Sequence, residues 1–193
     1  PVVIEPAALR AIKAAVPELP STAAARLTNT HAGLAPKLAR AIASKGRSTV
    51  AYFDACADAG IEWASRHGTK EPNSADVANW VTGVLVGAVK RHKGVTHKGG
   101  SSGGEPLRGL PESAGAARVG ELLARVAAST SMDSGVNSST GTSPVGAGIT
   151  ARMAKSVLAA MVSGDSRPIP EIATELFGGD EEDGAGGDGG GWG

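Results

Sequence analysis

Cysteine, aromatic residues and large aliphatic residues are all scarce in this sequence. Cys56 is the only cysteine among 193 residues, which excludes a disulfide scaffold. Six residues are aromatic. Leu, Ile, Val, Phe and Met together number 40, about 21% of the chain, just above the level at which a highly charged chain is disordered. Because so little apolar surface can be buried, we expect contacts with other copies or with a ligand to complete the fold.

Long hydrophobic runs are missing as well. The most apolar stretch, residues 77–89, would rise roughly 20 Å as a helix, whereas a bilayer core is about 30 Å thick. A transmembrane protein is therefore excluded. Residues 2–4 are too short for the apolar core of a secretory signal. A chain that begins at Pro1 is typical of a product whose initiator Met was removed in a cytoplasm, so we expect a reducing, cytoplasmic origin.

The sequence is instead rich in small residues, and its charges are unevenly distributed. Ala, Gly and Ser occupy 79 of the 193 positions. The formal net charge is zero, yet residues 1–98 carry 13 Lys and Arg against 7 Asp and Glu, and residues 99–193 carry 6 against 12. This asymmetry favours a polyanionic partner for the first half and indicates an acidic tail in the second.

Helical periodicity is clear along the chain, and strand patterns are nearly absent. Apolar residues lie on one side of a helix predicted over residues 48–67. Asn73 or Ser74 caps a second helix, whose part over residues 77–89 is apolar almost all round, with Gly83 and Gly87 one turn apart for the close approach of a neighbour. Further helices are predicted over residues 112–128, over residues 149–162, and from Pro168 or Pro170 to Gly178. Shorter segments punctuated by proline are predicted after Pro6, after Ser21 as a cap, and after Pro36.

These elements predict an all-α fold, a small helical bundle core with extended N- and C-terminal arms. Residues 1–47 form the N-terminal arm with short helices. Residues 48–177 form the helical core, interrupted by two long loops at residues 94–111 and 129–148. Residues 178–193 form an acidic, Gly-rich tail that cannot build a core.

Basic residues carry the strongest local signal. Four Lys or Arg and two His lie within residues 90–98, at the end of the apolar helix and before a Gly-rich stretch. Several cations on a pliable backbone suit phosphate neutralisation without reading of bases. The alternative is a solvated cluster that caps the helix, since cations also complement the helix dipole. The candidate nucleic-acid-binding residues in this cluster are Lys90, Arg91, His92, Lys93, His97 and Lys98.

Further basic residues lie on neighbouring predicted helices. Lys37, Arg40, Lys45 and Arg47 form a second group, and Arg118 and Arg125, seven residues apart, face the same way on their helix. We include Lys45, Arg47, Arg118, Arg125 and Arg152 among the candidate nucleic-acid contacts, although each alone also fits an ordinary solvated face. The aromatic residues fall in helical seams, so we expect binding to the nucleic-acid backbone.

Catalytic and metal sites find little support. Asp54, Asp58 and Glu62 recur every four residues, a spacing at which like charges destabilise a helix unless something neutralises them. A metal site or paired catalytic carboxylates, a solvated face with a Glu62–Arg66 pair, and a surface that docks a basic face of another copy all remain open. Cys56 and His67 lie eleven residues apart on one helix, roughly 16 Å and too far for a thiolate pair. We predict no catalytic residue, no metal and no cofactor.

The composition resembles that of viral proteins that sheathe RNA. It is similar to the proline-alanine-serine-rich proteins of polymycoviruses and, more distantly, to the coat proteins of flexuous filamentous viruses. Residues 141–144, Gly-Thr-Ser-Pro, resemble part of the potyvirus coat signature. The resemblance implies that Ser143 contacts a nucleotide and that Arg152 contacts its phosphate.

The function implied is that of a structural coat protein or nucleoprotein of a helical, filamentous capsid, not an enzyme. Such a protein polymerises as a homo-oligomer through its terminal arms and binds genomic RNA independently of sequence, in the virion and the host cytoplasm and without a membrane. Two alternatives stay open. One is a soluble host- or partner-binding protein with no nucleic-acid role, and the other is a DNA-binding regulatory protein.

Overall fold

The described parts of the chain are helical throughout. The structure, a computed structural model, describes residues 5, 18–92, 107, 109–132 and 149–178. Within these residues there are helices and turns but no strand, so the all-α prediction is confirmed. None of the helices in these segments is both long and apolar enough to cross a membrane.

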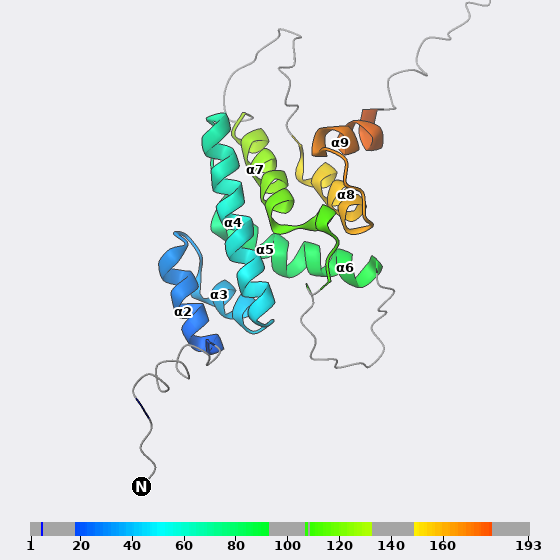
Figure 1. Cartoon of the computed structure of the whole chain (residues 1–193). Helices are drawn as coiled ribbons and strands as arrows, with labels where there is room; N and C mark the ends of the chain where they lie inside the picture. The colour runs from blue at the N-terminus through cyan, green and yellow to red at the C-terminus, as the bar shows by residue number, and fades with distance from the viewer. Residues whose placement is uncertain (1–4, 6–17, 93–106, 108, 133–148, 179–193) are drawn as a thin grey trace, which may run out of the picture.

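Figure 1 labels the elements in chain order. They are α2 (Pro20–Thr30), α3 (Pro36–Ala43), α4 (Arg47–His67), α5 (Ser74–Asn79), the π-helical turn η1 (Trp80–Leu85), α6 (Val86–His92), the short 3-10 helix η2 (Glu112–Ala114), α7 (Ala116–Met132), α8 (Ala151–Val162) and α9 (Ile169–Phe177). The helices α4 and α7 run side by side, α2 packs on α3 at one end, and α8 packs on α9 at the other (Figure 1).

Most helix boundaries follow from local chemistry. Proline stands in the first turn of α2, α3 and α9, where its missing N–H leaves no intrahelical bond unmade. The left-handed Gly68 ends α4, and the side chains of Asn73 and Thr150 accept backbone N–H bonds at the starts of α5 and α8. The predicted cap at Ser21 is wrong, because α2 already begins at Pro20 and has no side-chain cap.

The helix predicted over residues 112–128 is divided in the structure. It starts as η2, is interrupted at the extended Gly115, and continues as α7 to Met132. The N-terminal helix predicted after Pro6 lies outside the described residues. The second predicted long helix is α5, η1 and α6 in direct succession, with a π-helical turn in its middle.

Glycine mediates the closest helix contact, but not at the positions expected. A Cβ on Gly120 of α7 would lie 2.4 Å from the backbone oxygen of Cys56 and 2.9 Å from the Ala59 Cβ. A Cβ on Gly60 of α4 would lie 3.2 Å from the oxygen of Gly120. The backbones of α4 and α7 therefore touch. The expectation for Gly83 and Gly87 is wrong. Among the described residues, a Cβ on Gly83 would meet nothing within 4 Å, and a Cβ on Gly87 would meet only Nη1 of Arg91, from the same helix.

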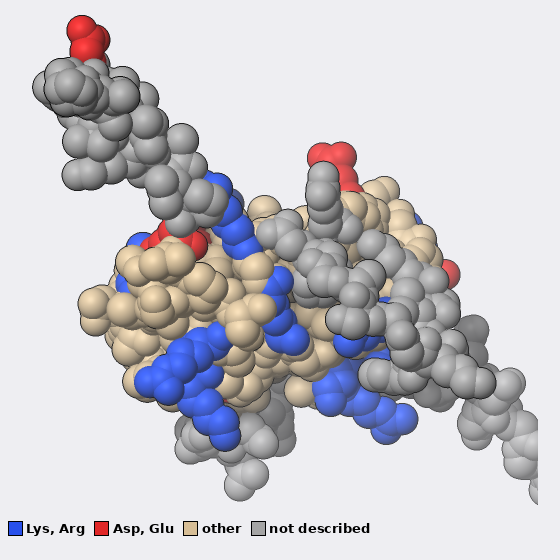
Figure 2. All heavy atoms as spheres, turned by 90° about the horizontal axis from the view of Figure 1, so that it is seen from below, with Lys and Arg blue, Asp and Glu red and all other residues tan. Residues whose placement is uncertain are grey.

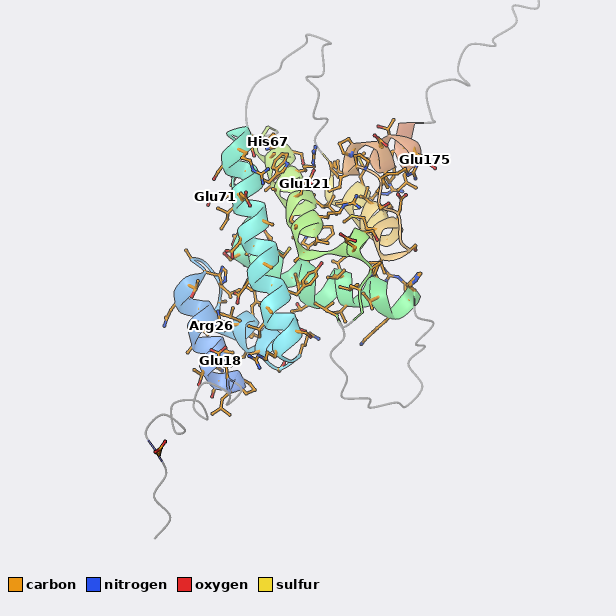
Figure 3. The ribbon with its side chains drawn as sticks, viewed as in Figure 1. Glu18, Arg26, His67, Glu71, Glu121 and Glu175 are labelled. Atoms are coloured by element: carbon orange, nitrogen blue, oxygen red, sulfur yellow. The ribbon has the colours of Figure 1, made fainter. Side chains whose placement is uncertain are left out.

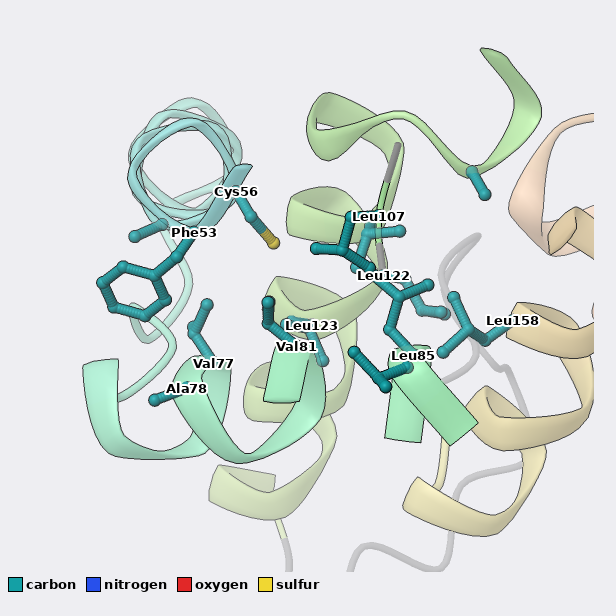
Figure 4. Packing of buried hydrophobic residues seen from close by; sticks show 14 of the residues in the cluster. Phe53, Cys56, Val77, Ala78, Val81, Leu85, Leu107, Leu122, Leu123 and Leu158 are labelled. Carbon is teal, nitrogen blue, oxygen red and sulfur yellow. The ribbon is translucent and has the colours of Figure 1, made fainter. Parts of the chain in front are cut away.

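One hydrophobic core connects the helices from α2 to α9. Phe53, Leu85, Leu122 and Leu158, from four different helices, are all fully buried in it, and Figure 4 shows this packing. The helices α2 and α3 contribute buried residues such as Leu27 to the same core. The small side chains let the helices approach closely, so that the described segments share a continuous apolar interior despite the scarcity of large aliphatic residues.

Candidate nucleic-acid interface

Cations without carboxylate partners gather where α3 leads into α4. Lys37 and Arg40 are exposed on α3, Lys45 lies half-buried in the connection, and Arg47 is the exposed first residue of α4. No carboxylate of a described residue lies within ion-pair distance of any of them. We call these four residues the α3–α4 basic group.

Two of these cations stand where a helix disfavours positive charge. Lys37 is in the first turn of α3 and Arg47 is in the first turn of α4, and neither first turn contains an acidic residue. The N-terminal end of a helix carries partial positive charge, so a cation there costs about 0.3–1 kcal/mol instead of stabilising the helix. Interaction with the helix dipole therefore does not explain the positions of these two cations.

The second basic group ends α6. Lys90, Arg91 and His92 are exposed in its last turn, where cations complement the helix dipole. The Arg91 guanidinium lies back along the helix, with Nη1 3.8 Å from the position that a Cβ on Gly87 would take. Figure 2 looks at the molecule from below Figure 1, the end at which α3 and the start of α4 lie, and Lys and Arg gather there in several groups with few Asp or Glu among them.

The other candidate residues lie elsewhere or outside the described segments. Arg152 is exposed in the first turn of α8. Arg118 donates to the backbone oxygen of Arg167, which ties α7 to the turn before α9. The remaining candidates, Lys93, His97, Lys98 and Ser143, lie outside the described residues.

Arg125 is engaged by protein partners at the other end of the molecule. It pairs with Glu121 at 2.9 Å, and its guanidinium carbon lies 4.9 Å from the centre of the Trp63 ring. His67 stacks on the same ring, with the centroids of His67 and Trp63 4.1 Å apart. Figure 3 places His67 and Glu121 far from Arg26 and Glu18. Because Arg118 and Arg125 both hold parts of the protein together, we leave them out of the proposed interface.

The acidic stripe, which consists of Asp54, Asp58 and Glu62 on α4, is neutralised mainly within the chain. Asp54 accepts from Arg26 at 3.0 Å and lies 2.8 Å from Nε2 of the buried His31, whose ring packs edge-on against Phe53. Partial burial alone would lower the pKa of Arg26, but hydrogen bonds to Asp54 and Glu18 outweigh it, and the pKa is raised. This network joins α2 to α4 (Figure 3 labels Glu18 and Arg26).

The rest of the stripe resembles an ordinary helix surface. Glu62 pairs with Arg66 one turn later at 3.0 Å, and Asp58 is exposed. Among the residues that the structure describes, no group of three or more His, Cys, Asp or Glu is placed to hold a metal ion. The sequence indicated that Asp54 needed a counter-charge, but its partners on α2 and in the turn after it lie 28 and 23 residues away and carry no local signal.

Cys56 and His67 are separated as expected. The Cys56 thiol is fully buried, and burial raises its pKa to about 12, so it is not a thiolate near neutral pH. His67 instead places Nδ1 2.8 Å from the Trp63 backbone oxygen. Near Cys56, the hydroxyl of Tyr52 donates to the oxygen of Ala114 at 2.7 Å, which ties α4 to η2.

Relatives of the chain come from algae and are named as subunits of one enzyme. This chain is 84% identical over 135 residues to the chloroplastic/mitochondrial B-2 subunit of the glutamyl-tRNA(Gln) amidotransferase of Micromonas commoda. That alignment covers 70% of this chain and 25% of the relative. It is 33% identical over 177 residues to the corresponding B-type subunit of Ostreococcus tauri, covering 92% of this chain and 26% of the relative. The B-2 subunit of Micromonas pusilla is 38% identical over 130 residues, covering 66% and 21%.

The chain spans about a quarter of the length of the first two relatives. No family model matches the sequence, and no solved structure matches it. The alignment with the Ostreococcus tauri protein covers nearly the whole chain.

These relatives overturn the viral interpretation. They are named as amidotransferase subunits, so the expectations of a coat protein and of a protein outside an enzyme are wrong. They are named chloroplastic/mitochondrial, which contradicts a virion or host-cytoplasm location. The predicted RNA-sheathing homo-oligomer, the partner-binding protein without a nucleic-acid role and the DNA-binding regulator do not fit them either.

The error has a physical cause. A high content of Ala, Gly and Ser suits close packing between subunits and close packing within one molecule equally well, and in this chain such residues serve the second purpose, as at Gly60 and Gly120. Composition alone does not distinguish the two. Residues 141–144, on which the coat motif depended, lie outside the described segments.

Proposed function

We propose that this chain is a tRNA-contacting helical region of the B-type subunit of an organellar glutamyl-tRNA(Gln) amidotransferase. In this role it helps to hold the tRNA substrate of the amidotransferase through its phosphates. The α3–α4 basic group, together with Lys90 and Arg91 at the end of α6, makes these contacts. Arg152 on α8 is an additional candidate.

The observation that carries the proposal is the position of Arg47. Arg47 is exposed, and no carboxylate of a described residue lies within ion-pair distance of it. It stands at the N-terminal end of a 21-residue helix, where positive charge is unfavourable. The relatives' names supply a matching polyanion, because tRNA presents a dense array of phosphates to which Lys and Arg bind without reading sequence.

The other end of α4 offers a matched control. Arg66 is also an exposed arginine on α4, but it pairs with Glu62 in the last part of the helix. Arg47 and Arg66 therefore have the same chemistry on the same helix. They differ because Arg47 belongs to the α3–α4 basic group, whereas Arg66 lies outside it and pairs with Glu62. A contact made by the basic group depends on Arg47 and not on Arg66.

The test is a salt titration of tRNA binding. The 193-residue chain is titrated with a transcribed glutamine tRNA at several salt concentrations, and the slope of log K against log salt is measured. We expect Arg47→Ala to weaken binding and to reduce the slope by about 1, and Arg66→Ala to leave both unchanged. Absence of binding at low salt, or equal effects of the two substitutions, would contradict the proposal.

A further inference from the structure

A pocket opens where three parts of the chain meet beside the basic end of α6. Its volume is about 390 Å³, and α6 packs against α8 next to it. The last turn of α6, the turn that precedes η2 and the C-terminal end of α8 each contribute to its wall. The lining residues used below are Val89, His92, Leu110, Pro111, Val162 and Ser163.

The lining has an apolar part and a polar side. In the apolar part, Val89 and Val162 are buried, and Leu110 and Pro111 are half-buried. On the polar side, Nδ1 of the exposed His92 lies 3.5 Å from the Ser163 hydroxyl oxygen. The same hydroxyl donates to the backbone oxygen of Ala159 at 3.0 Å, so its lone pairs remain able to accept.

Two glycines also line the pocket. Gly109 and Gly164 have φ of 75° and 105°, a conformation that side chains rarely adopt, and a Cβ at either would meet no atom within 4 Å. The backbone at both positions is therefore accessible from outside.

This combination matches an unstacked nucleobase. A base has two apolar faces and a polar edge, and proteins that bind single-stranded RNA bury such faces against flat or apolar side chains, histidine included, while they bond the edge. The adjacent charge has the matching sign, because Lys90 and Arg91 directly precede His92 and are positioned for the phosphates that flank a base. An apolar protein segment would gain nothing from these two cations.

We propose that this pocket receives one unstacked base from a single-stranded RNA loop while Lys90 and Arg91 contact the flanking phosphates. The inference rests on the proposed function and deepens it, because it adds recognition of a loop to contact with a phosphate backbone. His92, through the flat face of its ring, and Ser163, through its hydroxyl, are the residues that distinguish a loop from a duplex.

The test compares two RNAs with the same stem. One is a hairpin with a 2-aminopurine in its single-stranded loop, and the other is the stem closed as a blunt duplex. The 193-residue chain is expected to bind the hairpin on the order of 10-fold more tightly and to change the 2-aminopurine fluorescence, since stacking of one base accounts for such a factor. In His92→Ala we expect the hairpin to bind no more tightly than the duplex.

Two further variants separate the pocket from a general loss of structure. His92→Phe keeps a flat ring and is expected to retain most of the preference for the hairpin, whereas His67→Ala, at the distant Trp63 cluster, leaves binding of both RNAs unchanged. Circular dichroism checks that each variant keeps its helical content.

The outcomes distinguish the pocket from the basic face. If the wild-type chain binds both RNAs equally, or if His92→Ala weakens both alike, the pocket inference is overturned and the proposed phosphate contact stands. If neither RNA binds at low salt, the proposed function fails, and the pocket inference fails with it.

Discussion

The contact between α4 and α7 and the basic groups of α3, α4 and α6 follow opposite rules. At the α4–α7 contact, nothing larger than glycine fits at Gly120, because the nearest atoms are backbone atoms of Cys56 and Gly60 and the Cβ of Ala59, none of which can rotate away. In the basic groups the side chains are long, mostly exposed and without carboxylate partners among the described residues. The first region stabilises the fold, and the second carries charge that no carboxylate of the described residues neutralises. This difference separates substitutions that change stability from those that change binding.

The largest effect is expected at Gly120. In Gly120→Ala the new methyl group would lie 2.4 Å from the Cys56 oxygen, so α4 and α7 must separate. We expect the free energy of unfolding to fall by about 3 kcal/mol, the upper end of a usual overpacking cost, as measured by guanidinium denaturation.

Gly83→Ala is the matched control for that substitution. Gly83 is also a helical glycine, but a Cβ there meets open space, so we expect a gain of about 0.5–1 kcal/mol from the reduced freedom of the unfolded chain. Equal losses in the two variants would show that helical glycines in this chain are not distinguished by their contacts.

The next largest effect is expected from Asp54→Ala. This substitution removes the partner of Arg26 and leaves the Nε2 of buried His31 without its acceptor, so unfolding should become easier by about 1–3 kcal/mol in the same denaturation assay. Asp58→Ala, one turn further along α4 and exposed, should change stability by less than about 0.5 kcal/mol. A loss as large for Asp58 would contradict the assignment of Asp54 to a structural network.

A smaller effect of opposite sign is expected in the basic region. Arg47→Ala removes a cation from the N-terminal turn of α4, so the free energy of unfolding should rise by about 0.3–1 kcal/mol while tRNA binding weakens. Thermal denaturation at low salt detects the gain, and added salt should reduce it. Destabilisation by this substitution would mean that Arg47 serves the fold and would remove the contrast between the two regions.

The smallest effect is expected at the exposed turn between α8 and α9. Hydrogen bonds from the Arg167 side chain and backbone lower the pKa of Asp165 from 3.8 to about 2. A carboxyl group whose pKa is lower in the folded state than in the unfolded state stabilises the folded state at pH values above its unfolded pKa. The contribution of Asp165 is therefore present above pH 3.8 and is lost as the pH falls towards 2. Thermal midpoints of the wild type and Asp165→Asn should differ slightly at pH 6 and converge near pH 2. A difference that persists at pH 2 would contradict this assignment.

Local chemistry was enough to predict much of the fold. Proline in first turns, Gly68 after α4 and Asn73 before α5 act within a few residues along the chain, so the helix boundaries at these positions are evident from the sequence. The clusters of basic residues were likewise evident from the sequence, because their members lie close together along the chain. The π-helical turn at Trp80–Leu85 and the break at Gly115 were not predicted. The apolar pattern continues through the first, and a single glycine within a predicted helix does not fix where the helix breaks.

Amino-acid order alone specified the helices, most of their ends and the surplus of positive charge in the first half of the chain, because each depends on residues adjacent along the chain or one helical turn apart. Only the packed structure decided that Gly60 and Gly120, and not Gly83, allow two backbones to touch, and that Arg125 is engaged by Glu121 and Trp63. It also brought His92 next to Ser163 across 71 residues. Contacts between residues far apart in the chain arise when helices find the partners that bury their apolar faces, and no local pattern encodes that choice.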